Sequence, residues 1–138
     1  MVLQCDFGKN SYSTGIHRIR IIRHFGGAFI GIRSRHVQLE TCGEFLVGLY
    51  FETPSTYGWF TNGARVVNGC FADYGIDVPR TDAIMIELIL NCDEHRLTIA
   101  IDEDNSHRDE IKVDGIHASF PGCFFVQLGR MGARLSLE

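Results

Sequence analysis

The clearest pattern in the sequence is an alternation of apolar and polar positions between residues 84 and 101. Apolar side chains occupy every second position on both sides of the polar stretch 93–95: Ile84, Ile86, Leu88, Leu90 and Cys92 before it, and Leu97, Ile99 and Ile101 after it. A period of two is typical of strands that turn one face inward, so this segment predicts a β-hairpin. Met85 and Ile89 make the other face of the first strand apolar too, which predicts a central strand.

The remaining sequence predicts further short strands and no helix. Strands are expected at residues 2–7, 16–22, 28–33, 57–60, 65–67, 110–114 and 124–128 and around Leu135 and Leu137, with 45–51 either a strand or part of a long loop. Turns are expected at Gly26-Gly27, Asn62-Gly63, Asn68-Gly69 and 129–132, and irregular connections at 36–44, 70–81, 102–109 and 115–122. Gly31 is expected where a neighbouring strand approaches closely. About ten short strands at this spacing predict an all-β sandwich or barrel.

Composition adds limits to this picture. A chain of 138 residues, 45% hydrophobic and 22% charged, predicts one globular domain over residues 1–138. No apolar run reaches about 18 residues and the N-terminus lacks the pattern of a signal peptide, so a cytoplasmic protein is expected. Five widely spaced cysteines without a Cys-x-x-Cys pair predict reduced thiols, most of them buried.

Four blocks of this strand pattern, taken in order, resemble the SPRY (B30.2-type) domain family. The blocks are Ala28 to Ile32, Tyr57-Gly58-Trp59 followed by Asn68-Gly69, Ile86 to Ile99, and Phe120-Pro121 to Leu128. The resemblance covers nearly the whole chain from Gly15 onward and implies a bent antiparallel β-sandwich of the concanavalin type. It also implies a non-catalytic module without a cofactor that binds a peptide or a protein surface, often as the substrate receptor of a ubiquitin ligase.

The resemblance further implies where such a partner binds. The first inter-strand loop, the segment 45–51 and the turn before the last strand are expected to lie together on one loop face. The candidate partner-binding residues there are Tyr12, Leu46, Tyr50, Arg130 and Met131. Tyrosine, arginine and methionine suit peptide capture, since each combines a large contact area with a polar or adaptable part. Trp59, the single tryptophan, is expected in the core because of its place in a strand.

Other kinds of chemistry find little support in the sequence. Arg18, Arg20 and Arg23 form a basic strand face, but no aromatic residues alternate with them and the chain is acidic overall, at −4, so a solvated face or a patch for an acidic partner is expected instead of a nucleic-acid site. The acidic stretch 102–110 lacks the glycine and glutamate of a calcium loop. No histidine pair has metal-ligand spacing, and no nucleophile motif is present.

Two rival functions stay open from the sequence. A carbohydrate-binding lectin would use the same kind of sandwich, with an aromatic residue stacking on a sugar, although the calcium-ligand pattern is missing. A structural subunit of a larger assembly would use a sheet face instead of the loops. A glycan array distinguishes the first rival from a protein-binding module. A stoichiometric partner that persists after substitution of the loop residues would identify the second.

Overall fold

The computed structural model describes residues 4–5, 11–34, 56–76, 78–79, 83–101, 104–113 and 122–137, and all regular structure in these ranges is β. The strands are β1 (Gln4–Cys5), β2 (Ile16–Ser34), β3 (Tyr57–Phe60), β4 (Ala64–Val67), β5 (Cys70–Tyr74), β6 (Ile84–Asn91), β7 (Arg96–Ile101), β8 (Asp104–Lys112) and β9 (Gly122–Leu137). They form one antiparallel sheet in the order β5-β4-β3-β2-β6-β7-β8, with β9 beside β2 and β1 beside β9. The predicted all-β class is confirmed.

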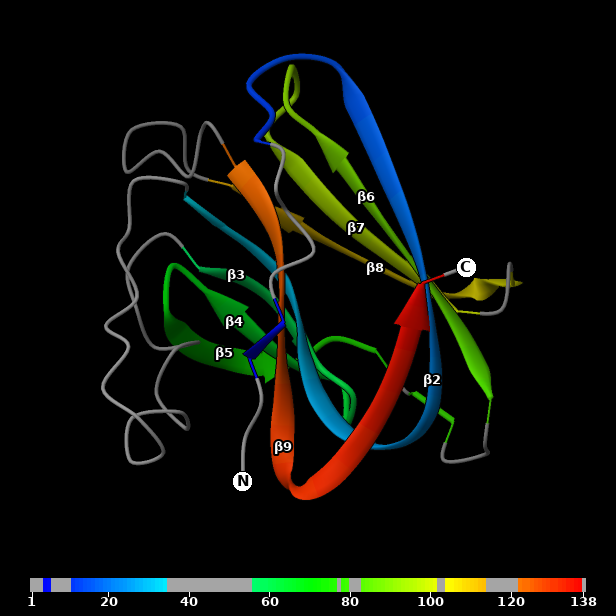
Figure 1. Cartoon of the computed structure of the whole chain (residues 1–138). Helices are drawn as coiled ribbons and strands as arrows, with labels where there is room; N and C mark the ends of the chain where they lie inside the picture. Colours follow the sequence, from blue (N-terminus) through cyan, green and yellow to red (C-terminus); the bar gives the residue numbers. More distant parts are fainter. Residues whose placement is uncertain are drawn as a thin grey trace.

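Two long, bent strands organise this sheet (Figure 1). The first half of β2 pairs with β6 and its second half pairs with β3, while β9 runs antiparallel to β2 from Leu137 opposite Ile21 to Gly122 opposite Ser34. The sheet therefore curls over at the bend, and β6-β7-β8 faces β3-β4-β5 as the second layer of a sandwich. Side chains from both layers fill one core, which includes Ile30, Leu88 and Leu97.

The expected turns at Gly26-Gly27 and at 129–132 are wrong: both stretches lie inside continuous strands. The register of β2 against β9 shifts between Arg23 and Phe25 and again between Gly26 and Ala28, and Gly26 has a φ of +83°. Bulges of this kind bend a strand without ending its pairing. Because β9 bends beside β2, the two strands cross from one layer to the other together, and four predicted short strands are two long ones.

Two strands at the sheet edges were also missed by the pattern analysis. Residues 70–74 and 104–109 were expected to be irregular, yet they form β5 and the first part of β8. Both strands end the described sheet, and every residue of β5 is exposed. An edge strand with exposed side chains need not alternate apolar and polar residues, so period-two analysis cannot detect it.

The central hairpin is confirmed residue by residue. β6 lies between β2 and β7, and Leu88 pairs with Ile99 on the inward face, where both are buried. Asn91 closes the turn by accepting a hydrogen bond at Oδ1 from the backbone N–H of Glu94, at 3.0 Å. His95 has a φ of +55°, which the chain needs to reverse direction before β7.

Gly31 and Gly58 pair across β2 and β3 at a close approach of the two strands. A Cβ on Gly31 would collide with the carbonyl oxygen of Tyr57, and a Cβ on Gly58 would collide with that of Ile30. The neighbouring side chain of Trp59 is fully buried, at 0% exposure, which confirms its predicted place in the core. The predicted close approach at Gly31 is thus confirmed.

The described cysteines are free thiols in two different environments. Cys92 and Cys123 are buried, as predicted, whereas Cys70 is exposed on the edge strand β5. Burial raises the pKa of the Cys92 thiol, and the carboxylate of Asp93 raises it further. At neutral pH Cys92 is therefore a neutral, inaccessible thiol.

This difference predicts selective alkylation. With iodoacetamide near pH 8 we expect Cys70 to react at least about tenfold faster than Cys92, because the thiolate is the nucleophile and a buried thiol must first be exposed by opening. Peptide mapping by mass spectrometry measures the rate at each cysteine. The pKa of Cys92 is higher in the folded chain than in the unfolded chain, so the buried neutral thiol contributes its full stability below the unfolded-state pKa. This contribution is lost as the pH rises through the folded-state pKa. Equal rates at both cysteines would contradict the burial of Cys92.

No helix in the described residues is long and apolar enough to cross a membrane.

Candidate functional site

One end of the sandwich gathers several connections between strands, among them the loop that carries Tyr12, and we call it the loop end. It comprises Ser11–Gly15, Ser34, Thr56, Cys92–His95, Val113 and Gly122. The backbones of Tyr12 and Gly122 exchange two hydrogen bonds of 2.9 Å. Gly122 also pairs with Ser34, which joins the first loop to the ends of β2 and β9.

The turn between β6 and β7 is tied to the same loop. The backbone N–H of Cys92 donates to the carbonyl oxygen of Gly15 at 2.9 Å, and the N–H of Gly15 donates to Oδ1 of Asp93 at 3.1 Å. The N–H of Val113 donates to the carbonyl oxygen of His95 at 2.8 Å, so the end of β8 lies there too. Several connections that are distant in sequence therefore meet at one end.

Tyr12 is held in this loop end by its ring. It stacks on His17 with ring centroids 3.9 Å apart and meets Phe124 edge-on at 5.9 Å. His17 in turn donates from Nε2 to the carbonyl oxygen of Thr14 at 2.7 Å. Tyr12 is half-buried and packs against the core, while Ser13 and Thr14 beside it are exposed. The ring thus anchors a short exposed loop.

Leu46 and Tyr50 lie outside the described residues, and their role at a partner site stays a prediction. The described chain leaves β2 at Ser34 and returns at Thr56, just before β3. Ile32 pairs with Tyr57, so these two points are neighbours at the loop end. Ser34 and Thr56, the described residues on either side of the segment 35–55, therefore both lie at the loop end.

Arg130 and Met131 are not at the loop end. Both lie within β9 at its bend, where only their backbone is described. Arg130 is eight residues beyond Gly122, which corresponds to about 25 Å of strand. The expectation that these two residues share one face with Tyr12 is therefore wrong, because the glycine-flanked stretch 129–132 bends one strand instead of turning the chain back at the loop end. Whether Arg130 and Met131 contact a partner stays a prediction.

Sequence analysis also missed an aromatic surface on β5. Phe71 and Tyr74 are 62% and 74% exposed, and Phe71 stacks on Phe60 of β3 with ring centroids 5.3 Å apart. An open depression of about 400 Å³ adjoins Tyr74 and is lined by Asn62, Gly75 and Ile76 as well. The signal for it in the sequence is a pair of aromatic residues three positions apart within 70–81, where an irregular connection is expected.

The predicted basic strand face is largely neutralised and partly buried. Arg18 and Arg20 both form ion pairs with Glu87, at 3.5 Å and 3.0 Å. Arg23 points inward, with 6% of its surface exposed, and donates to the carbonyl oxygen of Pro79 at 2.7 Å. The three arginines therefore do not form one open basic patch.

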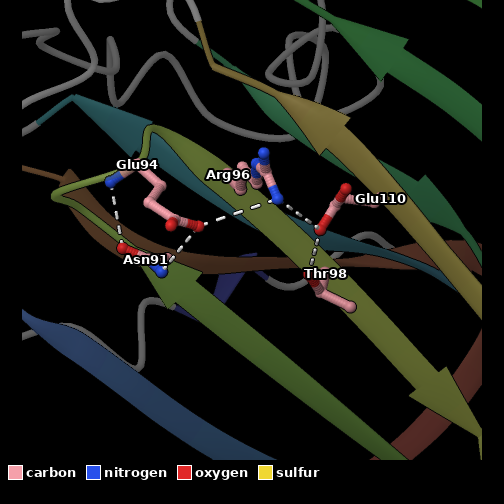
Figure 2. Close-up of polar contacts among 5 residues, drawn as sticks. All are labelled: Asn91, Glu94, Arg96, Thr98 and Glu110. Carbon is pink, nitrogen blue, oxygen red and sulfur yellow. Dashed lines mark hydrogen bonds and ion pairs between the residues drawn. The ribbon is translucent and has the colours of Figure 1, made fainter.

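Further polar contacts cover the outer face of β6, β7 and β8 (Figure 2). Arg96 lies between Glu94 and Glu110, with N–O distances of 3.7 Å and 4.0 Å, and Thr98 donates to Glu110 at 3.5 Å. Asn91 joins the same network by donating from Nδ2 to Glu94 at 3.4 Å. Exposed ion pairs of this length contribute little to stability. The network makes the hairpin end of this face polar, although Thr98 itself is buried. Among the described residues, no group of three or more His, Cys, Asp or Glu could hold a metal ion.

Comparisons with known proteins agree with this architecture. No protein-family model matches the sequence, and no curated protein matches it. Among solved structures, the chain is similar to the TRIM65 PSpry domain, with a TM-score of 0.63 at 16% identity over 99% of this chain and 68% of that one. It is similar to the SPRY domain of human HERC1, with a TM-score of 0.61 at 11% identity over 94% and 75%.

The chain is also similar to stonustoxin, with a TM-score of 0.66 at 10% identity over 99% of this chain and only 20% of that one. The strand order, the two bent strands and the likeness to the TRIM65 and HERC1 domains agree with the resemblance seen in the sequence. The chain therefore has the SPRY-type fold, a curled antiparallel β-sandwich.

Proposed function

We propose that this chain is a non-catalytic protein-interaction module that captures a short segment or a surface of another protein at its loop end. The observation that carries the proposal is the convergence of connections there: the Tyr12 loop, the turn 92–95 and both points at which the chain leaves and rejoins the strands around residues 35–55. The SPRY-type fold supports a role in protein interaction. Neither nucleic acid nor a membrane is the proposed target.

The geometry of the first loop suits this role because the loop is held in place before any partner arrives. Two backbone hydrogen bonds to Gly122, one hydrogen bond to Asp93 and the Tyr12–His17 stack hold residues 11–15. Ordering a loop during association costs free energy, so a loop that is already ordered retains more of the contact energy as affinity. The exposed positions Ser13, Thr14 and Glu94 are then available to a partner.

The finer assignment belongs to the same proposal and rests on the family resemblance. SPRY domains often supply the substrate-binding part of ubiquitin ligases, and we assign this role, in the cytoplasm, to the present module. In that case the loop end selects the substrate, and the ligase activity resides in another segment or subunit. A partner that is ubiquitinated only when the loop end is intact would support this assignment.

Partner capture tests the proposed site. We compare the wild-type chain with Tyr50→Ala and Tyr12→Ala by affinity purification and mass spectrometry, and then measure the affinity of a recovered partner. We expect each variant to weaken binding by about 30-fold or more, as central aromatic contacts in interfaces commonly do. Tyr12→Phe keeps the stack on His17 and is the matched control for Tyr12.

Stability and location controls make the result interpretable. Tyr12 packs against the core, so thermal unfolding must show that Tyr12→Ala is folded at the assay temperature. Arg130→Ala changes a residue at the bend in the middle of β9, away from the loop end, and should leave a loop-end partner bound. A partner set that is unchanged in both tyrosine variants would contradict the proposal, and loss of the set only in Arg130→Ala would move the site to the bend.

A further inference from the structure

β5 and β8, the two ends of the main strand order, differ in character. β8 ends one side of the sheet and includes Arg108, Asp109, Glu110 and Lys112, a charged sequence of the kind that protects an edge from pairing. β5 ends the other side with the sequence Cys-Phe-Ala-Asp-Tyr, which contains no lysine, arginine or proline. All five of its residues are exposed, and Figure 1 shows β5 as the outermost strand beside β4. β5 therefore has Asp73 as its single charged residue and is much less charged than β8.

A bulge arranges the aromatic side chains of β5 on one face. Phe71 pairs with Val66, and Tyr74 pairs with Ala64. Phe71 and Tyr74 are three positions apart on β5, whereas Ala64 and Val66 are only two positions apart on β4, so β5 contains one extra residue. Val66 and Ala64 lie on the same face of β4, so the register shift brings Phe71 and Tyr74 to one face of the sheet. The exposed rings of Phe71 and Tyr74, with the half-buried Phe60 on which Phe71 stacks, form an aromatic platform along the edge.

The opposite side of the same strand is acidic. Asp73 is 66% exposed, and its Oδ1 lies 3.5 Å from Nε of Arg65. That nitrogen is closer to another carboxylate, Oδ2 of Asp109, at 2.8 Å. Arg65 therefore forms ion pairs with two carboxylates. Asp73, the more exposed of the two, faces solvent, and the shared arginine compensates only part of its charge.

We propose that β5 accepts an extended segment of another protein, which adds to the sheet as a further strand. Successive side chains of a strand point to opposite faces, so such a segment places alternate residues over the aromatic platform and beside Asp73. Apolar residues fit the first set of positions and lysine or arginine the second. The partner is thus a segment in which apolar and basic residues alternate.

Charge decides between this partner and a second copy of the chain. β5 contains Asp73 and no basic residue, so pairing of two β5 strands brings acidic groups together without a counter-charge from the strand itself. Like charges opposed across two strands are destabilising. A segment with basic residues on that side supplies the counter-charge to Asp73 instead.

A designed peptide tests the proposal with the full chain. The probe is a blocked, fluorescein-labelled heptapeptide that alternates lysine with valine or phenylalanine, and its affinity is measured by fluorescence polarisation. A second peptide replaces each lysine with glutamate, and a third carries N-methyl groups on one hydrogen-bonding edge. We expect the wild-type chain to prefer the lysine peptide at least tenfold over the glutamate peptide and over the N-methylated one.

Variants of β5 locate the binding. Asp73→Lys should reverse the peptide preference, which a loss of folding cannot do, and Phe71→Ser/Tyr74→Ser should weaken both peptides at least tenfold. Arg108→Ser on the guarded edge β8 and Tyr12→Phe at the loop end are matched controls and should bind like the wild type. If the control variants bind the peptides as weakly as the β5 variants do, the proposal is overturned. The proposed loop-end site is not affected by that result.

Two further outcomes would also overturn it. Equal binding of the N-methylated peptide would show that no strand is added, because the backbone hydrogen bonds would then be irrelevant. A wild-type dimer in light scattering that dissociates in Phe71→Ser/Tyr74→Ser, without peptide binding in either protein, would assign the edge to a second copy of the chain.

Discussion

Gly31→Ala is expected to leave little folded protein. The new methyl group would collide with the carbonyl oxygen of Tyr57, and Cα of Gly58 lies only 2.8 Å from the same position. Both obstacles are backbone atoms, so no side chain can rotate away and β2 must separate from β3. Overpacking of this kind, without a flexible neighbour, should cost more than about 4 kcal/mol, a large part of the stability of a typical domain.

A second glycine in the same strand is the matched control. Gly27 has ordinary space for a Cβ, whose nearest neighbour is Oγ1 of Thr61 at 3.7 Å, and its φ is not positive. Gly27→Ala should therefore change the free energy of unfolding by less than about 1 kcal/mol. Gly58→Ala should be as damaging as Gly31→Ala, because its Cβ would collide with the carbonyl oxygen of Ile30.

Soluble yield, circular dichroism and urea unfolding measure these effects. If Gly31→Ala unfolds within about 1 kcal/mol of Gly27→Ala, β2 and β3 do not approach as closely as described. The expected contrast bears on the whole fold, since β2 is the strand that pairs with β3, β6 and β9. A separation at Gly31 disturbs the strand that joins the two layers.

The sequence predicted the interior of this fold better than its edges or its bends. Strands buried on one or both faces, such as β6 and β7, carry an alternation that cannot be shifted by one residue without exposing the core. β5 and β8 lack that constraint, and their sequences give no period. The bends at Gly26-Gly27 and 129–132 use the same glycines that a tight turn uses, so composition alone does not distinguish a bend from a reversal.

The same ambiguity explains what sequence analysis could and could not say about the site. Tyr12 was assigned to a binding loop, and the structure shows it in the loop that meets Gly122 and the turn 92–95. Arg130 was assigned to that face because 129–132 was expected to reverse the chain there. The sequence does not predict the aromatic edge, because Phe71 belongs to a surface only together with Phe60 and Tyr74. Phe60 stacks on it from β3, and a bulge brings Tyr74 to the same face.

Asp109→Ala is the second substitution with a large expected effect. Asp109 comes from β8 in one layer, yet its Oδ2 accepts a hydrogen bond from Nε1 of Trp59 at 2.8 Å and forms an ion pair with Nε of Arg65, also at 2.8 Å. Trp59 and Arg65 pair with each other across β3 and β4 in the other layer. A single carboxylate with 11% of its side chain exposed thus connects the two layers.

Removing this carboxylate takes the acceptor from the Trp59 indole and the closer of two carboxylates from Arg65. Trp59 is fully buried and would lose the acceptor of its indole N–H, while the Arg65 side chain, 30% exposed, would keep a partly buried charge. Breaking a fully buried pair costs about 3–5 kcal/mol, and the partial exposure of Arg65 lowers that figure. With the lost hydrogen bond included, we expect about 3 kcal/mol for Asp109→Ala.

Two controls separate the parts of this effect. Asp109→Asn retains an oxygen that can accept from Trp59 and loses only the charge, so its cost should be intermediate. Asp73→Ala removes the exposed carboxylate that faces the same arginine at 3.5 Å, and should cost less than about 1 kcal/mol. We call the contacts of Asp109 with Trp59 and Arg65 the bridge. Trp59 is the single tryptophan, so its fluorescence reports the state of the bridge during urea unfolding.

The bridge also links stability to the aromatic edge. Gly75 directly follows β5, and a Cβ there would collide with both Nε of Arg65 and Oδ2 of Asp109. The bridge therefore determines where the chain can pass as it leaves β5. In Asp109→Asn, which we expect to remain folded, binding of the lysine peptide should weaken although no residue of β5 has changed. If Asp109→Ala costs no more than Asp73→Ala, Asp109 does not connect the layers, and the position of β5 must be set by its pairing with β4 alone.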